Sequence, residues 1–156
     1  MKPIIPLNPQ FAVTGALDPA DFAEAARLGY RTILSNLPDG EMRQMPSSQE
    51  AARLAAEAGL AYRHIPATRF DVLGEEVLGA TLQAVSDLPG PILAHCASGM
   101  RSAVAWGGAA ARFNDADAVL AKLGKAGFNL APLKSEFAAL RRADAGAPPP
   151  ALKIEG

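Results

Sequence analysis

The chain has 156 residues, close to the usual size of one domain, and 49% of them are hydrophobic while 20% are charged. Its 15 Lys and Arg residues nearly balance its 16 Asp and Glu residues, so the formal net charge is −1. This composition excludes a disordered chain, and it lacks the excess of positive charge that nucleic acid or an anionic membrane would attract. A single cysteine, Cys96, excludes an internal disulfide framework and argues against a cysteine-rich zinc site. We expect neither a metal nor another cofactor.

The amino-terminal sequence and the hydropathy of the chain predict where the protein works. The first ten residues contain three prolines and no continuous apolar run, so they do not resemble a signal peptide. No apolar stretch approaches the roughly 20 residues that span a bilayer. We therefore expect a soluble protein of the cytoplasm. The composition leaves its oligomeric state open.

Strand-like and helical patterns alternate along the chain. A strand is expected at residues 11–14, and Asp18 followed by Pro19 then begins a helix. The capping-box pattern of Ser47 with Glu50 begins the next helix. Further strands are expected at 30–36, 61–65 and 91–95, and further helices at about 74–88, 102–113, 115–125 and 132–143. This alternation predicts an α/β fold with a mostly parallel central sheet of four to five strands, flanked by helices.

The chain divides where the last expected helix ends. Residues 1–143 are predicted to form one domain. Residues 144–156 begin with Asp-Ala-Gly-Ala-Pro-Pro-Pro, which cannot continue a helix because proline lacks the backbone donor and its ring clashes with the preceding turn. We expect this Pro-rich tail to be extended and flexible.

Cys96 lies between an expected buried strand and an expected helix. Ligand sites of open α/β sheets lie outside the carboxyl ends of the strands, so chemistry is expected here. A loop that turns from a strand into a helix directs backbone N–H groups inward, and the amino terminus of the helix adds partial positive charge. We therefore expect Cys96 to react as a thiolate, and its loop to bind an anion. The predicted anion-binding loop consists of Ala97, Ser98, Gly99, Met100 and Arg101.

The residues around Cys96 suit such a loop. The guanidinium of Arg101 can pair with two oxygens of a tetrahedral anion at once, which a lysine cannot do. Gly99 permits a positive φ or a close approach of the backbone. Ser102 is expected to cap the following helix or to donate its hydroxyl to the sulfur. His95 is expected to point away from the loop and to orient the backbone of Cys96.

Several segments resemble a known family. The pattern His95-Cys96-x4-Arg101-Ser102 after an apolar strand is similar to the signature loop of cysteine-dependent phosphatases, although the usual spacing is one residue longer. The shorter spacing resembles rhodanese sulfurtransferase loops. Over about residues 8–140 the chain resembles the bacterial phosphatase-like domain family of the beta-lactamase-hydrolase-like protein. The matching segments are 11–17, 36–41, 62–66, 91–102 and 125–130.

The resemblance implies a dual-specificity-phosphatase-like fold. It also implies that Cys96 is the nucleophile and Arg101 the anion-binding side chain, with Ser102 beside them among the catalytic residues.

The resemblance also implies a general acid, and here the sequence departs from the family's pattern. Phosphatases of this type use an aspartate on a loop before the cysteine. The nearest candidate here is Asp71, 25 positions before Cys96, which is a shorter separation than that family uses. Asp71 is either this acid or an ordinary turn residue before the next helix. Asp39 and Glu41 are expected on the same rim, either as the acid or as a Pro-Asp-Gly turn followed by a solvated glutamate.

Three functions are consistent with these residues. A phosphatase would use the Cys96 thiolate to attack phosphorus while Arg101 and backbone N–H groups stabilise the oxygens. A sulfurtransferase would take sulfur from thiosulfate or a persulfide and carry it on Cys96. A non-catalytic module would bind phosphate or a partner through the same loop. The resemblance favours the phosphatase, a hydrolase acting on a small anionic substrate such as a phosphate ester.

Overall fold

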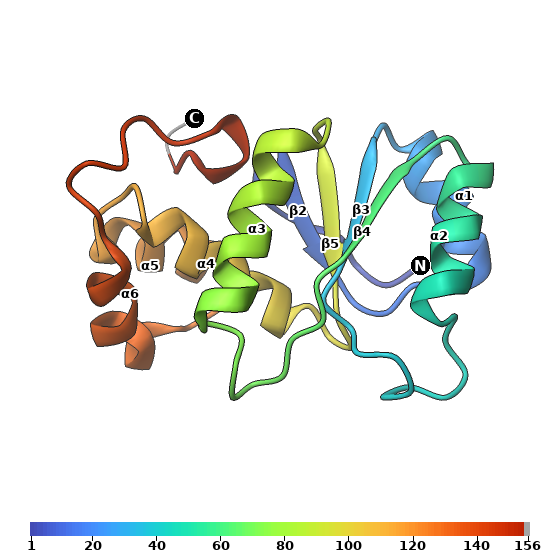
Figure 1. Ribbon diagram of the computed structural model, residues 1–156, viewed down its shortest axis with the longest axis horizontal. Helices are drawn as coiled ribbons and strands as arrows, with labels where there is room; N and C mark the ends of the chain where they lie inside the picture. The colour runs from blue at the N-terminus through green and yellow to red at the C-terminus, as the bar shows by residue number, and fades with distance from the viewer. Residues whose placement is uncertain (155–156) are drawn as a thin grey trace.

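The computed structural model describes residues 1–154, and its centre is a five-stranded sheet (Figure 1). The strand order across the sheet is β1-β2-β5-β3-β4, so the chain passes from β2 to β3 and later returns to insert β5 between them. All neighbours pair in parallel except β1, which is antiparallel to β2. The strands are β1 (Ile5–Asn8), β2 (Phe11–Thr14), β3 (Thr32–Ser35), β4 (Ala61–His64) and β5 (Ile92–His95). The predicted α/β class and the mostly parallel sheet are confirmed.

Helices cover both faces of the sheet. Helices α1 and α2 lie on one face, α3 and α4 lie on the other, and α5 and α6 pack beyond α4 (Figure 1). Each face has its own buried apolar cluster because neighbouring strand residues point in opposite directions: Ile33 faces α1 and α2, and Leu34 faces α3 and α4. The helical segments are α1 (Pro19–Arg27), α2 (Ser48–Glu57), α3 (Glu75–Asp87), α4 (Met100–Ala111), α5 (Ala116–Lys125), α6 (Lys134–Leu140) and the short 3₁₀ turn η1 (Ala131–Leu133).

Helix α4 is rich in alanine and glycine because it is enclosed by its neighbours. Ten of its residues are buried. A Cβ atom on Gly107 would lie 2.7 Å from Cζ of Phe137 on α6, and one on Gly108 would lie 2.6 Å from Leu73. A larger residue at either position would push the neighbouring side chain away. The helix that follows the Cys96 loop is therefore held rigidly in the core.

The first strand, β1, is not predicted by the sequence. The prolines around and within it disfavour a strand, since proline cannot donate to a ladder. The strand forms because it lies at the edge of the sheet, where only one side needs hydrogen bonds. Its pairing with β2 protects that strand from solvent and completes the five-stranded sheet.

The described part of the Pro-rich tail, residues 144–154, differs from its expectation, and residues 155–156 lie outside the described residues. Instead of extending freely, it folds back and forms a second 3₁₀ turn, η2 (Pro150–Leu152). Leu152 is 0% exposed, the Trp106 indole donates to the carbonyl of Ala151 at 2.8 Å, and the Asn8 amide donates to carbonyls at both ends of the turn. Proline prevents a helix here, but it does not prevent packing. The buried contacts outweigh the conformational entropy that the segment loses when it is ordered.

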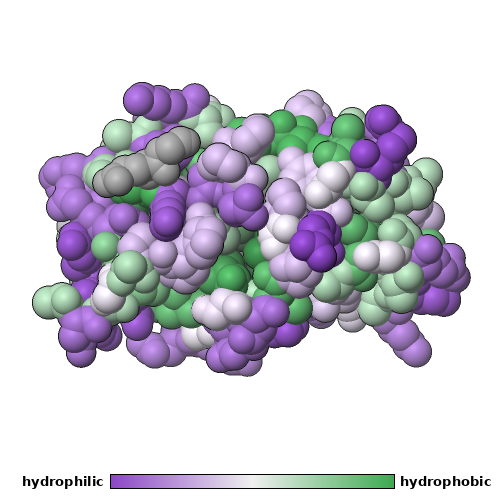
Figure 2. Space-filling model, turned by 90° about the horizontal axis from the view of Figure 1, so that it is seen from above, coloured by the Kyte–Doolittle hydropathy of each residue, from purple (hydrophilic) through white to green (hydrophobic). Residues whose placement is uncertain are grey.

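The carboxyl ends of the parallel strands meet at one end of the molecule, the lower edge in Figure 1, and the longest loops gather there. Figure 2 shows the opposite end, where hydrophilic and hydrophobic residues are mixed. Within residues 1–154, no helix is both long and apolar enough to cross a membrane. Across the same residues, no group of three or more His, Cys, Asp or Glu side chains is placed to hold a metal ion.

Candidate active site

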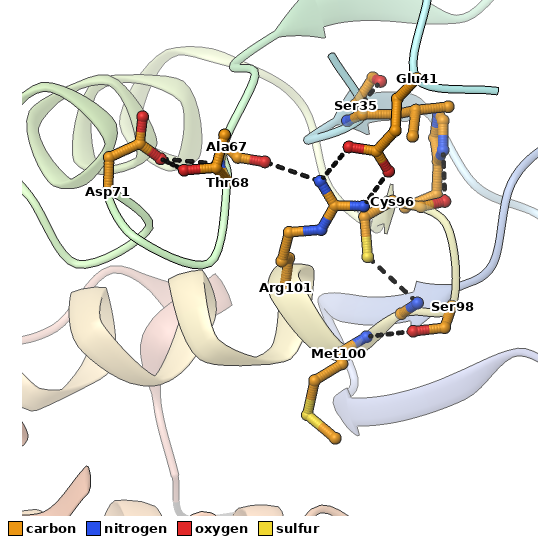
Figure 3. A network of polar contacts seen from close by, with 12 residues as sticks. Ser35, Glu41, Ala67, Thr68, Asp71, Cys96, Ser98, Met100 and Arg101 are labelled. Carbon is orange, nitrogen blue, oxygen red and sulfur yellow. Dashed lines mark hydrogen bonds and ion pairs between the residues drawn. The ribbon is translucent and has the colours of Figure 1, made fainter.

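The loop after β5 encloses the sulfur of Cys96. The backbone turns at Gly99, whose φ of 97° lies in the left-handed region that glycine adopts without strain. This turn brings the Gly99 N–H to 3.1 Å from the Cys96 sulfur, to which it donates (Figure 3). A Cβ atom on Gly99 would lie 3.4 Å from the carbonyl oxygen of Thr14. Both properties of glycine that the sequence suggested, positive φ and close approach, are therefore present at this residue.

The rest of the loop is anchored to the neighbouring strand end. The carbonyl of Ala97 accepts from the backbone N–H of Ala16, just beyond β2, at 3.1 Å. Ser98 and Met100 are exposed, whereas Cys96 is 0% exposed. The nucleophile predicted from the sequence thus lies at the base of the loop, with the side chains of Ser98 and Met100 at its rim.

Arg101 is held by two partners on different loops. Its Nη1 donates to Oε1 of Glu41 at 2.9 Å and to the carbonyl of Ala67 at 2.8 Å, and its Nη2 donates to Oε2 of Glu41 (Figure 3). A guanidinium has five N–H donors, so these bonds use three of them. The Nε–H and one Nη2–H donate to no oxygen within the described part of the chain, and they face the Cys96 sulfur. They form a second fork, which a tetrahedral anion can occupy without displacing Glu41.

The charges of this pair are fixed by their contact. Hydrogen bonding from Arg101 lowers the pKa of Glu41, so its carboxyl group is ionised at neutral pH. The pKa of Arg101 is raised by its hydrogen bonds to Glu41 and, to a lesser extent, by the nearby Cys96 sulfur. Glu41, which the sequence placed on the rim as a possible acid, therefore orients the guanidinium and has no proton to donate at neutral pH.

Two further carboxylates are tied into local turns. Oδ1 of Asp71 accepts from the backbone N–H of Thr68 at 2.7 Å and from its hydroxyl at 3.1 Å. In Figure 3, Asp71 lies beyond Thr68 as seen from Arg101. Asp39 accepts from the backbone N–H and the hydroxyl of Ser48, both at 2.6 Å, and these bonds lower its pKa. Asp39 thereby attaches the loop that carries Glu41 to the start of α2.

Ser102 does not contact the sulfur, contrary to one expectation. Its hydroxyl donates to Oδ1 of Asn36 at 2.8 Å, and the single hydroxyl proton cannot also serve Cys96. The amide of Asn36 in turn donates to the carbonyl of Ile65 at 2.8 Å. Helix α4 begins after Gly99, so Ser102 is not its cap either. Asn36 was not predicted as a site residue, although an asparagine directly after a buried strand is a signal that could have identified it.

The two histidines lie outside the loop. His64 contacts the carbonyl of Leu37 through Nε2 at 2.8 Å. His95 is on the side of the sheet that α1 and α2 cover, with Nδ1 3.5 Å from the carbonyl of Cys96, and its Nε2 has no partner in the part of the chain that the structure describes. Burial lowers the pKa of His95 to about 4. The imidazole is therefore neutral at neutral pH.

Lowering the pH from 7 to 5 should reduce the free energy of unfolding by up to about 2 kcal/mol through His95. The unfolded chain binds a proton at this residue below about pH 6.5, but the folded chain does so only near pH 4. Protons in this range consequently favour the unfolded state. Urea unfolding at the two pH values should show the loss in the wild type and a weaker loss in His95→Gln. An unchanged pH dependence in that variant would contradict this account.

The family described as the phosphatase-like domain of the beta-lactamase hydrolase-like protein matches residues 4–112. The chain belongs to this family. The match includes all five strands, the Cys96–Arg101 loop and helix α4. A beta-lactamase hydrolase-like protein of Xylella fastidiosa is 34% identical over 103 residues, which are 64% of this chain and 23% of that protein. The chain therefore spans only about a quarter of the length of this curated relative.

This phosphatase-like domain is also similar to solved structures. A crystal structure of a candidate phosphatase from Neisseria meningitidis has 28% sequence identity and a TM-score of 0.74, covering 88% of this chain and 98% of that one. The core catalytic domain of a PP-IP phosphatase from S. cerevisiae, in complex with citrate, has a TM-score of 0.65. Its identity is 15%, and the match covers 93% of this chain and 90% of that one. The second likeness establishes the fold alone.

Proposed function

We propose that this domain is a cysteine-dependent phosphatase that uses Cys96 as its nucleophile. The observation that supports this most directly is the free fork of Arg101. Glu41 and Ala67 fix the guanidinium on one side, and two N–H donors remain on the other, close to the sulfur and to the backbone of the loop. Donors arranged around a buried nucleophile can stabilise the negative oxygens of a phosphoryl group as it is transferred.

The proposed reaction has two steps. The thiolate of Cys96 attacks phosphorus, the sulfur–phosphorus bond forms, and the bond to the ester oxygen breaks. The leaving oxygen takes the electron pair and, where the leaving group is basic, a proton from solvent water. Water then attacks the phosphocysteine, which releases inorganic phosphate and restores the thiolate. Arg101 and the backbone N–H groups bind the non-bridging oxygens in both steps.

Mass spectrometry of the intact protein tests this proposal. After brief exposure to p-nitrophenyl phosphate and rapid acid quenching, one phosphoryl group should be found on the wild-type chain, and peptide mapping should locate it on Cys96. Cys96→Ser, treated in the same way, should carry no thiophosphate. Turnover without any modification of Cys96, or modification of another residue, would contradict the proposed mechanism.

The length of the loop favours a second candidate, sulfur transfer. Only four residues separate Cys96 from Arg101, and a shorter loop encloses less space for a phosphoryl group. In this reaction the thiolate attacks the outer sulfur of thiosulfate, the sulfur–sulfur bond breaks, and sulfite leaves with the electron pair. A persulfide then remains on Cys96 until a thiol or cyanide accepts the sulfur. Thiosulfate in place of the ester in the same experiment would reveal one added sulfur atom.

Asp71→Asn should cause only a small and uniform loss of phosphatase activity. The carboxylate is engaged by Thr68, and an asparagine oxygen can accept the same hydrogen bonds. Substitution of an exposed turn residue changes free energies by about 0.5 kcal/mol or less. The measurement is kcat/KM for phenyl phosphate and for p-nitrophenyl phosphate, whose leaving group is already a stable anion. A general acid contributes about 10²–10⁴-fold, so a loss of that size confined to phenyl phosphate would restore Asp71 as the acid.

A further inference from the structure

A pocket opens beside the anion-binding loop and contains a second arginine. Its volume is about 400 Å³, and it is lined by Glu41, Thr68, Arg69, Ser98, Met100 and Arg101. The proposed mechanism uses Arg101 and the backbone of the loop but assigns nothing to Arg69. Arg69 belongs to the loop after β4, which also supplies the Ala67 carbonyl that holds Arg101.

Arg69 is exposed and stacks on the side chain that follows it in the chain. Its guanidinium lies over the ring of Phe70, with its central carbon 4.7 Å from the ring centroid. Phe70 is 85% exposed and belongs to neither buried cluster, so no core packing competes with this stacking. Stacking occupies the face of a guanidinium and leaves the N–H groups at its edge free to donate. Within residues 1–154, no ion pair of Arg69 is found.

The charges lining the pocket leave one positive charge unbalanced. Glu41 is paired with Arg101, and Arg69 adds a cation with no matching carboxylate among the lining residues. A phosphoryl group in the loop would take the free fork of Arg101. The remainder of the substrate, the leaving group, would then extend into the pocket that Arg69 lines.

We propose that Arg69 binds a second anionic group on the substrate, carried by the leaving group, so that the preferred substrates are diphosphates and similar compounds. This inference rests on the proposed phosphatase function. Cleavage of a diphosphate also suits the carboxylates of the site. Asp39 and Glu41 have lowered pKa values and are ionised at neutral pH, so they hold no proton for a leaving group. When the anhydride bond breaks, the departing phosphate takes the electron pair as a stable anion and needs no proton from them.

Binding of inorganic phosphate and pyrophosphate to Cys96→Ser tests the proposal by calorimetry at neutral pH and one fixed, low salt concentration. Pyrophosphate should bind about tenfold more tightly than phosphate, because it adds charge-assisted hydrogen bonds to Arg69. Adding Arg69→Gln should remove most of this difference while changing phosphate binding less than about twofold. Arg43→Gln is the matched control, since Arg43 is exposed on the loop that carries Glu41 but does not line the pocket.

Three results would overturn the inference. Equal affinity for the two anions, or a pyrophosphate preference that survives Arg69→Gln, would show that Arg69 does not bind a second anionic group. An equal loss with Arg43→Gln would assign the preference to general charge. Failure of Cys96→Ser to bind either anion would overturn the proposed function itself. With Cys96 intact, Arg69→Gln should lower kcat/KM about tenfold for pyrophosphate but not for p-nitrophenyl phosphate, which gives a second readout.

Discussion

Cys96→Ser is expected to abolish phosphate-ester hydrolysis, with a loss on the order of 10⁴-fold or more, since removal of a covalent nucleophile eliminates the reaction path. The fold should persist because a serine oxygen can accept the Gly99 N–H as the sulfur does at 3.1 Å. The free energy of unfolding should therefore change by only about 1 kcal/mol. Initial rates with p-nitrophenyl phosphate and urea unfolding of the same preparation measure both effects.

The control for this prediction is binding without chemistry. Arg101, its partner Glu41 and the backbone of the loop are untouched in Cys96→Ser, so inorganic phosphate should still bind. A variant that retains more than about one per cent of the wild-type rate would show that Cys96 is not the nucleophile. Loss of phosphate binding together with a cooperative, wild-type-like unfolding curve would contradict the anion site formed by Arg101 and the loop, and with it the proposed function.

Arg101→Lys should lower kcat/KM about 10²–10³-fold although it keeps the positive charge. A lysine ammonium cannot reproduce the fork formed by Nε and Nη2, nor the paired contact with Glu41 on the other edge. Steady-state kinetics with p-nitrophenyl phosphate provide the measurement. Arg53→Lys on α2 is the matched control, because Arg53 forms only exposed ion pairs with Glu50 and Glu57, and such pairs contribute about 1 kcal/mol or less.

A double-variant comparison distinguishes orientation from direct contact. Glu41→Gln should cost less than Arg101→Lys, since it leaves the guanidinium in place with weaker support from one side. The combined variant should lose less activity than the product of the two single losses, because both changes disrupt one contact. Fully multiplicative losses would mean that Glu41 acts independently of Arg101. A lysine variant with more than half of the wild-type rate would contradict the role of Arg101.

The local signals that predicted the fold depend on near neighbours in the chain. The alternation of apolar patterns with capping residues predicted α/β architecture, and Ser47 does accept from the N–H of Glu50 at the start of α2. Gly99 is a similar case, because a tight turn between a strand and a helix needs a residue that tolerates positive φ. Such features follow from backbone conformation over a few residues, which a sequence pattern records directly.

Features that depend on distant partners were predicted poorly. The prolines near Ile5–Asn8 argued against a strand there. Strand β1 forms only because it can pair with β2 at the edge of the sheet. The tail was expected to be free, but Trp106 and Asn8, far away in the sequence, give its carbonyls partners. In both cases the pattern described the local preference correctly. The tertiary contact then outweighed that preference.

The candidate site shows the same division. The sequence by itself determined that Cys96, Gly99 and Arg101 share one loop at the carboxyl end of a buried strand, since they are near neighbours in a strand–loop–helix segment. It did not determine which carboxylate would meet Arg101, because Glu41 is 60 residues away in the sequence. Asp71, Asp39 and Glu41 were considered only as a possible acid, and spacing alone did not show which of them lies beside Arg101.

Only the tertiary structure decided between them. The parallel pairing of β3 with both β4 and β5 places the loops after these strands at one rim, where Glu41 reaches Arg101 and the turn at Thr68 engages Asp71. The physical reason is that a side chain's charge and direction depend on which strand ends are neighbours. Strand order is a property of the folded sheet, and no local segment of the sequence contains it.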